Sequence, residues 1–279
     1  MDPKVMEKCL SMYKRYEELK KLEEKKKKNS SSSSSNVTTD DHEMKTQIEF
    51  EARLGYWDDK NEIFNSGVDK NFILRALSLV DLYKGWSSVV DWHEIHDFFY
   101  KEKSSGDNLR TSVKFDLENK KIITKHIKKN TYDRLNLKFL EECEVKQQSF
   151  TSNPSIRLSL ATEIPISASV VGEIVDPFFV RIKKRKSYFY TPAGFSEPVW
   201  VFDFTLSWDG VTKSEAEQKQ KKKNPKYEME VEFLSPLTYQ LFKNESSEYV
   251  IQSFLMKIVD FFKTDFSNNH LMLSNLRNI

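Results

Sequence analysis

The chain has 279 residues and a formal net charge of +2, because 44 lysines and arginines nearly balance 42 aspartates and glutamates. This balance excludes a protein that coats nucleic acid with uniform positive charge, so any preference for phosphate must come from a local cluster of side chains. The 7 glycines form neither a GxGxxG nor a GxxxxGK[ST] motif, which excludes the usual loop-based nucleotide sites.

The cysteine content indicates a reducing compartment. Cys9 and Cys143 form neither a CxxC pair nor a disulfide framework. No His/Asn constellation accompanies Cys143, which we therefore expect to be a core thiol rather than a nucleophile. No run of 18 apolar residues is present, so we expect a soluble intracellular protein that does not associate with a membrane.

The N-terminal region differs in composition from the rest of the chain. Residues 3–28 form a Lys/Glu-rich segment whose apolar residues recur at helical spacing, which predicts a helix that is either packed or solvated. The serine tract Ser30–Ser35 predicts a flexible linker. We therefore divide the chain into a basic helix and linker (1–43), one principal domain (44–266) and a tail (267–279).

The principal domain has the pattern of a mainly β protein. From about residue 44 to 235, short segments of alternating character are separated by turn-like stretches. Helices are predicted at Asp69–Leu82 and at Ser246–Lys263, and the apolar stripe of the second predicts a packing face. The Lys-rich stretch Lys213–Lys226 predicts an exposed loop or a short helix.

One face of each predicted strand is apolar and the other carries charge, because side chains alternate along a strand. The acidic faces belong to the first and last strands. They contain Glu49 and Glu51 with Arg53, and Glu228, Glu230 and Glu232. The other charged faces are mainly basic. They contain Arg110 and Lys114, Lys125 from the strand-like stretch Lys121–Ile127, Arg157 with Glu163, and Arg181, Lys183 and Arg185.

A single strand of this kind is ordinarily half-buried with a solvated outer face. Three like charges at alternate positions repel, however, and several such strands together indicate bound ions of opposite sign. If the two acidic strands are neighbours, the sheet closes into an antiparallel barrel and Glu49, Glu51, Glu230 and Glu232 converge. Carboxylates without histidine or cysteine select Mg²⁺ or Mn²⁺. The basic ring opposite them matches a triphosphate, and so much charge requires a wet tunnel.

The charged segments resemble a known family, the metal-dependent RNA triphosphatases of fungal, protist and large-DNA-virus mRNA capping, which are triphosphate tunnel metalloenzymes. Six pieces occur in the family's order between residues 44 and 235. They are IEFEARLG (48–55), LRTS (109–112), RLSLATE (157–163), RIKKRKSY (181–188), FDFT (202–205) and YEMEVEF (227–233).

The resemblance implies a closed eight-stranded antiparallel β-barrel tunnel with peripheral helices, and it implies a role for each charged residue. Glu49, Glu51 and Glu232 would be direct metal ligands. Glu230 and Glu228 would be ligands through water or partners of basic residues. Arg110, Lys183 and Arg185 would hold the γ-phosphate, with Arg181 and Lys125 as further contacts. Glu163 would orient the attacking water and Asp203 would anchor an arginine. Arg53, Lys114 and Arg157 are assigned to substrate binding.

The assignment of Lys125 depends on the strand register, because Lys121, Lys128 and Lys129 lie nearby and could take its place as the phosphate contact. The pair His93 and His96 lacks the spacing of HExxH and is expected to be structural.

The implied activity is removal of the γ-phosphate from triphosphate-ended RNA, in the nucleus or, for a virus-encoded protein, in the viral factory or virion. No KxDG motif is present, which implies a separate mRNA guanylyltransferase as partner. The sequence leaves open a monomer or a homodimer. It also leaves open tripolyphosphate, thiamine triphosphate or nucleoside triphosphates as substrate, and a non-catalytic module that binds RNA ends or polyphosphate.

Overall fold

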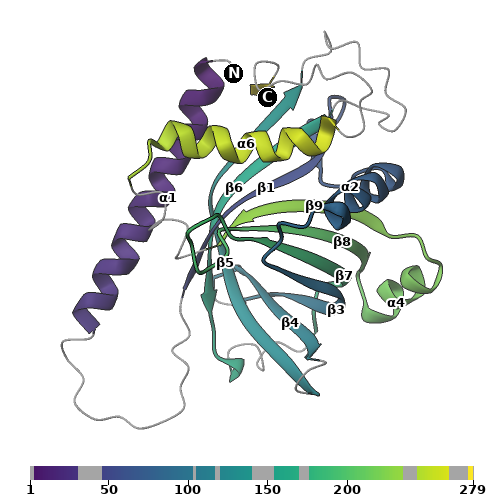
Figure 1. Cartoon of the computed structure of the whole chain (residues 1–279). Coiled ribbons are helices and arrows are strands. Elements are labelled where there is room, and N and C mark those ends of the chain that lie inside the picture. The colour runs from purple at the N-terminus through teal and green to yellow at the C-terminus, as the bar shows by residue number, and fades with distance from the viewer. Residues whose placement is uncertain are drawn as a thin grey trace.

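The computed structural model describes residues 3–30, 46–102, 105–116, 120–139, 154–169, 176–234, 244–263 and 276–278. Within them, eight antiparallel strands form a closed ring (Figure 1). In order around the ring these are β1 (Gln47–Asp58), β6 (Pro154–Pro165), β5 (Lys121–Phe139), β4 (Asn108–Asp116), β3 (Ser88–Lys101), β7 (Phe179–Tyr190), β8 (Trp200–Gly210) and β9 (Lys226–Phe233). The expected closed eight-stranded barrel is confirmed.

The pairing of β9 with β1 closes the ring. Its register sets Glu51 opposite Glu232, Ala52 opposite Val231 and Arg53 opposite Glu230. Among the described residues, two short strands lie outside the ring: β2 (Ile63–Asn65) pairs antiparallel with the end of β1, and β10 (Leu276–Asn278) pairs antiparallel with β5. The two acidic strands are therefore neighbours.

Apolar residues of the strands face outward, beneath two helices. Phe50, Ala52 and Leu54 of β1 belong to the main hydrophobic core, together with residues of α1 (Pro3–Ser30) and α6 (Ser247–Lys263). Figure 1 shows α6 crossing α1 over the region of β6 and β1. The inward face is left for the alternate, charged side chains.

Helix α1 is packed rather than solvated. Its buried residues Tyr13 and Tyr16 make ring contacts with Phe50 of β1 and Phe233 of β9, at centroid distances between 5.7 and 6.2 Å. Phe254 of α6 contacts the same two phenylalanines at 5.5 and 4.6 Å. Aromatic residues from both helices thus cover the outer side of the β1–β9 junction.

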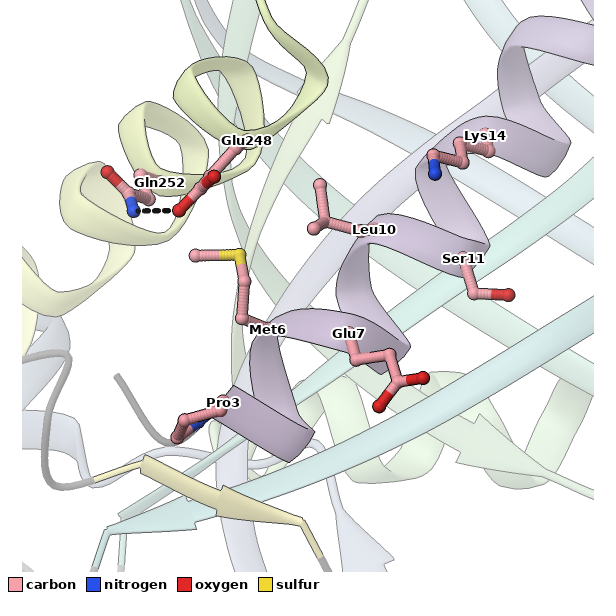
Figure 2. A pocket seen from close by; sticks show the side chains of 8 residues that line it. All are labelled: Pro3, Met6, Glu7, Leu10, Ser11, Lys14, Glu248 and Gln252. Atoms are coloured by element: carbon pink, nitrogen blue, oxygen red, sulfur yellow. Dashed lines mark hydrogen bonds between the residues drawn. The ribbon is translucent and has the colours of Figure 1, made fainter.

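Helices α1 and α6 also border a groove of about 580 Å³ (Figure 2). The residues that line it are Pro3, Met6, Glu7, Leu10, Ser11, Lys14, Glu248 and Gln252. The side chain of Gln252 donates a hydrogen bond to Glu248 across 3.2 Å. The groove belongs to the outer layer and holds none of the charged strand residues singled out in the sequence.

Two further helices of the described residues each begin after a capping residue. Helix α2 (Lys70–Leu82) follows Asp69, whose carboxylate accepts a hydrogen bond from the Asn71 amide at 2.7 Å. Helix α4 (Lys213–Lys221) occupies the predicted Lys-rich insertion and is capped by Thr212. No helix among the described residues is long and apolar enough to span a membrane.

Two strands differ from the sequence-based expectation. Strand β3 was not predicted, because its register shift between Val90 and His93 interrupts the alternation and much of it is exposed. Strand β5 extends to Phe139, well beyond the expected Lys121–Ile127, since a second irregularity between Thr131 and Asp133 hides its continuity. Cys143, most of the serine tract and most of the predicted tail lie outside the described residues.

The packing of α1 can be tested by removing one aromatic ring. We expect Tyr13→Ala to lower the free energy of unfolding by roughly 3 kcal/mol or more, as truncations of large buried aromatic side chains do. Urea unfolding followed by circular dichroism measures the change. Tyr132→Ala is the matched control, because Tyr132 of β5 is 48% exposed, and should cost under about 1 kcal/mol. Equal effects of the two substitutions would contradict the packing of α1.

Candidate active site

The charged side chains of the strands point into the barrel because the apolar residues next to them in sequence pack outward, in the hydrophobic core. Phe50 packs outward, so Glu49 and Glu51 on either side of it point inward. The register then sets Gln47 opposite Glu163 and Glu51 opposite Ser159 on β6, and Lys125 opposite Ser112 across β5 and β4. Residues distant in sequence are thereby brought onto one inner surface.

Carboxylates concentrate on one side of this surface. Burial raises the pKa of Glu49 to about 7, with further contributions from Glu163 and Glu51, although the nearby Lys129 opposes the shift. The pKa of Glu232 is raised well above its ordinary value, first by burial and then by Glu49 and Glu51. These three carboxylates therefore share a region where negative charge is in excess.

Lys129 partly balances that charge. Its Nζ lies 2.5 Å from Glu49 and 3.8 Å from Glu51. Glu232, in contrast, has no hydrogen bond or ion pair with any residue in the described part of the chain. A half-buried carboxylate without an ion pair is costly, so this position fits a bound cation.

Glu230 differs from its neighbours because it is fully paired. Arg53 Nε lies 3.0 Å from its carboxylate and Arg185 Nη2 lies 3.3 Å from it. Although burial opposes the shift, these two guanidinium groups lower the pKa of Glu230 to about 2. Asp203 lies 2.6 Å from Arg185 Nη1, so this carboxylate is a second ion-pair partner of Arg185. The structure thus places Glu230 as a partner of arginines.

A basic surface lies opposite the carboxylates, and Lys183 is at its centre. Lys183 Nζ lies 2.5 Å from the buried Asp97 of β3, which also accepts a hydrogen bond from Ser112 at 2.6 Å. Burial and the positive charge of Arg185 lower the pKa of Lys183 to about 8, although Asp97 opposes the shift. Asp97 was missed in the sequence, because β3 was not recognised as a strand.

Glu163 connects the basic surface to β6. Arg110 NH2 lies 2.6 Å from one of its carboxylate oxygens and Lys125 Nζ lies 3.0 Å from the other. Although burial opposes the shift, Arg110 and Lys125 lower the pKa of Glu163 to about 2. Lys125 also donates to Gln47 at 2.8 Å. Glu163 is therefore an ionised hydrogen-bond acceptor held between two cations.

The register of β5 separates the lysines that the sequence left unresolved. Lys125 and Lys129 point inward, to Glu163 and to Glu49. Lys128 instead pairs with Glu102 and Asp107, and Lys121 is exposed. Lys129 is therefore a second site residue of this strand, which the sequence left as an unresolved neighbour of Lys125; the two lysines are four residues apart and share one face of the strand.

Four further sequence candidates lie apart from the carboxylate cluster. Arg181 is held by Asp209 through Nε at 2.6 Å and NH2 at 2.9 Å. Glu228 pairs with Lys226 at 3.1 Å and accepts a hydrogen bond from a serine of the β2–α2 connection at 2.9 Å.

Arg157 donates to Asn136 at 2.8 Å and lies over the Phe64 ring. Lys114 is exposed and has no ion pair or hydrogen bond with any described residue.

No cluster of three or more His, Cys, Asp or Glu side chains in the described residues is already arranged to hold a metal ion. His93 and His96 contact the Asp91 carbonyl and the Glu94 carboxylate instead. The oxygen donors of Glu49, Glu51 and Glu232 nevertheless have the chemistry that Mg²⁺ and Mn²⁺ prefer. Glu232 has no ion pair with any described residue, which supports the same three carboxylates as the metal ligands.

The closed ring of antiparallel strands with a charged interior defines the class of fold, and comparisons with known proteins agree with it. No protein-family model and no curated protein sequence matches the chain. Among solved structures, the Pct1 RNA triphosphatase of S. pombe aligns with a TM-score of 0.51 and 15% identity, over 80% of this chain and 86% of that chain.

The structure of S. pombe Pct1 in complex with the Spt5 CTD gives the same TM-score at 16% identity, over 80% of this chain and 87% of that chain. The mimivirus capping enzyme triphosphatase aligns with a TM-score of 0.44 and 11% identity, over 77% of this chain and 89% of that chain. At these identities the similarity to Pct1 shows a shared fold, the one that the sequence resemblance implied.

The contrast between Glu232 and Glu230 can be tested by stability measurements in EDTA. The pKa of Glu232 is raised in the folded protein, so its charged form destabilises the fold increasingly as pH rises above the ordinary value of 4.5. We expect Glu232→Gln to stabilise the metal-free protein at pH 8 by on the order of 1 kcal/mol, and by less at pH 5.

Glu230→Gln should instead destabilise the protein by about 3 kcal/mol, because it removes one charged partner from each of two half-buried guanidinium groups, those of Arg53 and Arg185. Urea titrations at the two pH values measure both variants. A destabilising Glu232→Gln would contradict the uncompensated charge assigned to Glu232.

Proposed function

We propose that this protein is an RNA 5′-triphosphatase, which removes the γ-phosphate of triphosphate-ended RNA in the first step of mRNA capping. The observation that carries the proposal is the pairing of two surfaces inside one barrel. Glu49, Glu51 and Glu232 form an excess of negative charge, and Lys183, Arg185 and Arg110 face it. A polyanion bridged to a cation satisfies both surfaces.

Glu49, Glu51 and Glu232 are the residues that would hold Mg²⁺ or Mn²⁺. Such an ion would supply positive charge to the γ-phosphate oxygens, which would lower the barrier to phosphoryl transfer. Lys129, between Glu49 and Glu51, keeps these carboxylates from repelling each other. Glu230 contributes indirectly, by fixing Arg53 and Arg185.

The basic residues bind and orient the phosphate. Arg185 uses three of its N–H groups on Asp203, Glu230 and Thr205. A guanidinium has five such groups, so two remain for phosphate oxygens while the others hold it in place. Lys183, held by Asp97, supplies a second fixed positive charge. Preorganised cations of this kind stabilise charge on the transferred group without reorganisation.

Glu163 is suited to orienting water rather than to taking up its proton. A pKa of about 2 keeps the carboxylate ionised at neutral pH, which makes it a good acceptor of hydrogen bonds and a weak base. Its two cationic neighbours fix both of its oxygens. Glu163 therefore aligns a water molecule for in-line attack on the γ-phosphorus.

The capping assignment extends to partners and to location. We propose a separate mRNA guanylyltransferase as partner, and the nucleus, or the factory or virion of a virus, as the site of action. A homodimer is a possible assembly. Inorganic tripolyphosphate, thiamine triphosphate or a nucleoside triphosphate remains the alternative substrate. A non-catalytic module that binds RNA ends is disfavoured, because anion binding has no use for the uncompensated Glu232.

The test of the proposed function is the release of γ-³²P from triphosphate-ended RNA by purified protein, with Mg²⁺ or Mn²⁺ added. We expect metal-dependent release, and a loss of at least about 10²-fold in kcat for Glu51→Ala. Glu197→Ala is the control, because Glu197 is exposed outside the barrel. Folded protein that releases no phosphate from RNA, nucleotide or tripolyphosphate would leave the binding module as the remaining function.

The pH dependence tests the role of Lys183. Because the pKa of Lys183 is lowered to about 8, it loses its charge as pH rises through 8, and kcat/KM for RNA should fall over the same range. An arginine stays charged, so Lys183→Arg should remove this alkaline decline. The same decline in both proteins would assign it to another group.

A further inference from the structure

Two phenylalanines interrupt the charged inner surface of the barrel. Phe98 of β3 packs in an outer cluster with Val180, Ile182 and Trp208. Its neighbour Phe99 therefore points inward, as does Phe179, which precedes Val180 on β7. The two residues are directly opposite each other in the β3–β7 pairing.

Their rings form a preformed aromatic surface. The ring centroids are 5.5 Å apart with an interplanar angle of 60°, and both side chains are half-buried. The Arg181 guanidinium carbon lies 5.7 Å from the centroid of the Phe179 ring. Asp209 holds that guanidinium with two hydrogen bonds, at 2.6 and 2.9 Å. A fixed cation beside two partly open rings suits a flat, electron-rich ligand.

The position of this surface relates it to the phosphate-binding residues. The inward face of β7 carries, at alternate positions, Phe179, Arg181, Lys183 and Arg185. Phe179 is four residues from Lys183, which corresponds to about 13 Å along the strand. A triphosphate and a ribose together span such a distance. With the γ-phosphate at Lys183 and Arg185, Arg181 lies along the path to the 5′ nucleotide.

We propose that Phe99 and Phe179 are the stacking surface for the first base of the triphosphate-ended RNA. This inference rests on the proposed function for the location of the γ-phosphate. Stacking on aromatic rings tolerates every base, so the surface distinguishes a nucleic-acid end from a bare polyphosphate without selecting a sequence. The rings bind substrate and take no part in the chemical step.

The experiment uses the full-length protein and a short triphosphate-ended RNA that carries 2-aminopurine as its first base. Stacking on the wild-type protein should quench the fluorescence of the base. We expect Phe179→Ala to abolish most of the quenching and to raise the KM for RNA by about tenfold. The kcat and KM for inorganic tripolyphosphate, which has no base, should be unchanged.

Two further variants control the experiment. Phe179→Tyr keeps an aromatic ring and should retain the quenching and the KM for RNA. Phe115→Ala removes a 52% exposed phenylalanine of β4 whose neighbour Lys114 takes the inward position, and should change neither readout.

Equal changes of KM for RNA and tripolyphosphate in Phe179→Ala would mean a structural role and overturn the inference. So would persistent quenching in that variant, or phosphate release from RNA by a wild-type protein that causes no quenching. In that last case the proposed hydrolysis would be supported and the stacking surface would be rejected. Quenching that depends on Phe179 in a protein without hydrolysis would support the stacking surface and reject the proposed activity.

Discussion

The pairing of β9 with β1 is the constraint on which the remaining structure depends. It sets Glu51 opposite Glu232 on the inward face, and residues directly opposite in an antiparallel pair have Cβ atoms only about 5 Å apart. Two carboxylates at that spacing disfavour the pairing unless positive charge is nearby. Lys129, Arg53 and Arg185 provide part of that charge, but among the described residues Glu232 has no ion pair of its own. The site is thus assembled by the same contact that closes the barrel.

The stability needed to hold this charge comes from the opposite face of the same strands. Phe50 and Phe233 flank the acidic residues in sequence and meet Tyr13, Tyr16 and Phe254 on the outside. Burial of these rings is worth several kcal/mol each, which offsets the unfavourable electrostatics inside. Helices α1 and α6 are therefore part of what keeps the carboxylates in place, although none of their described side chains forms an ion pair with the interior cluster.

The alternation of side chains made much of this predictable. Glu49, Glu51 and Glu232 were assigned to the charged face of their strands because the apolar Phe50 and Val231 occupy the opposite face. The two acidic strands then implied that the sheet closes into a barrel. Lys129 was left unresolved and Asp97 was missed, because their roles depend on which strands pair and in what register. Neither is a local property of the sequence. The bulges in β3 and β5 also broke the period that would have revealed both strands. Ion-pair partners could not be assigned, since Glu228, Glu230 and Glu232 have equivalent places in the pattern and different neighbours in space.

The closing pair of strands also bears on how this chain can vary over evolutionary time. Because the period of a strand is two, inserting or deleting a single residue within β1 or β9 would exchange its two faces. Carboxylates would then meet the aromatic rings of α1 and α6, while phenylalanines filled the interior. Point substitutions can accumulate at these strands with graded effects, but changes of length cannot. Related chains are therefore expected to differ in length at the connections between strands, and to keep the spacing from Glu49 to Glu51 and from Glu228 to Glu232 even when little else in the sequence is shared.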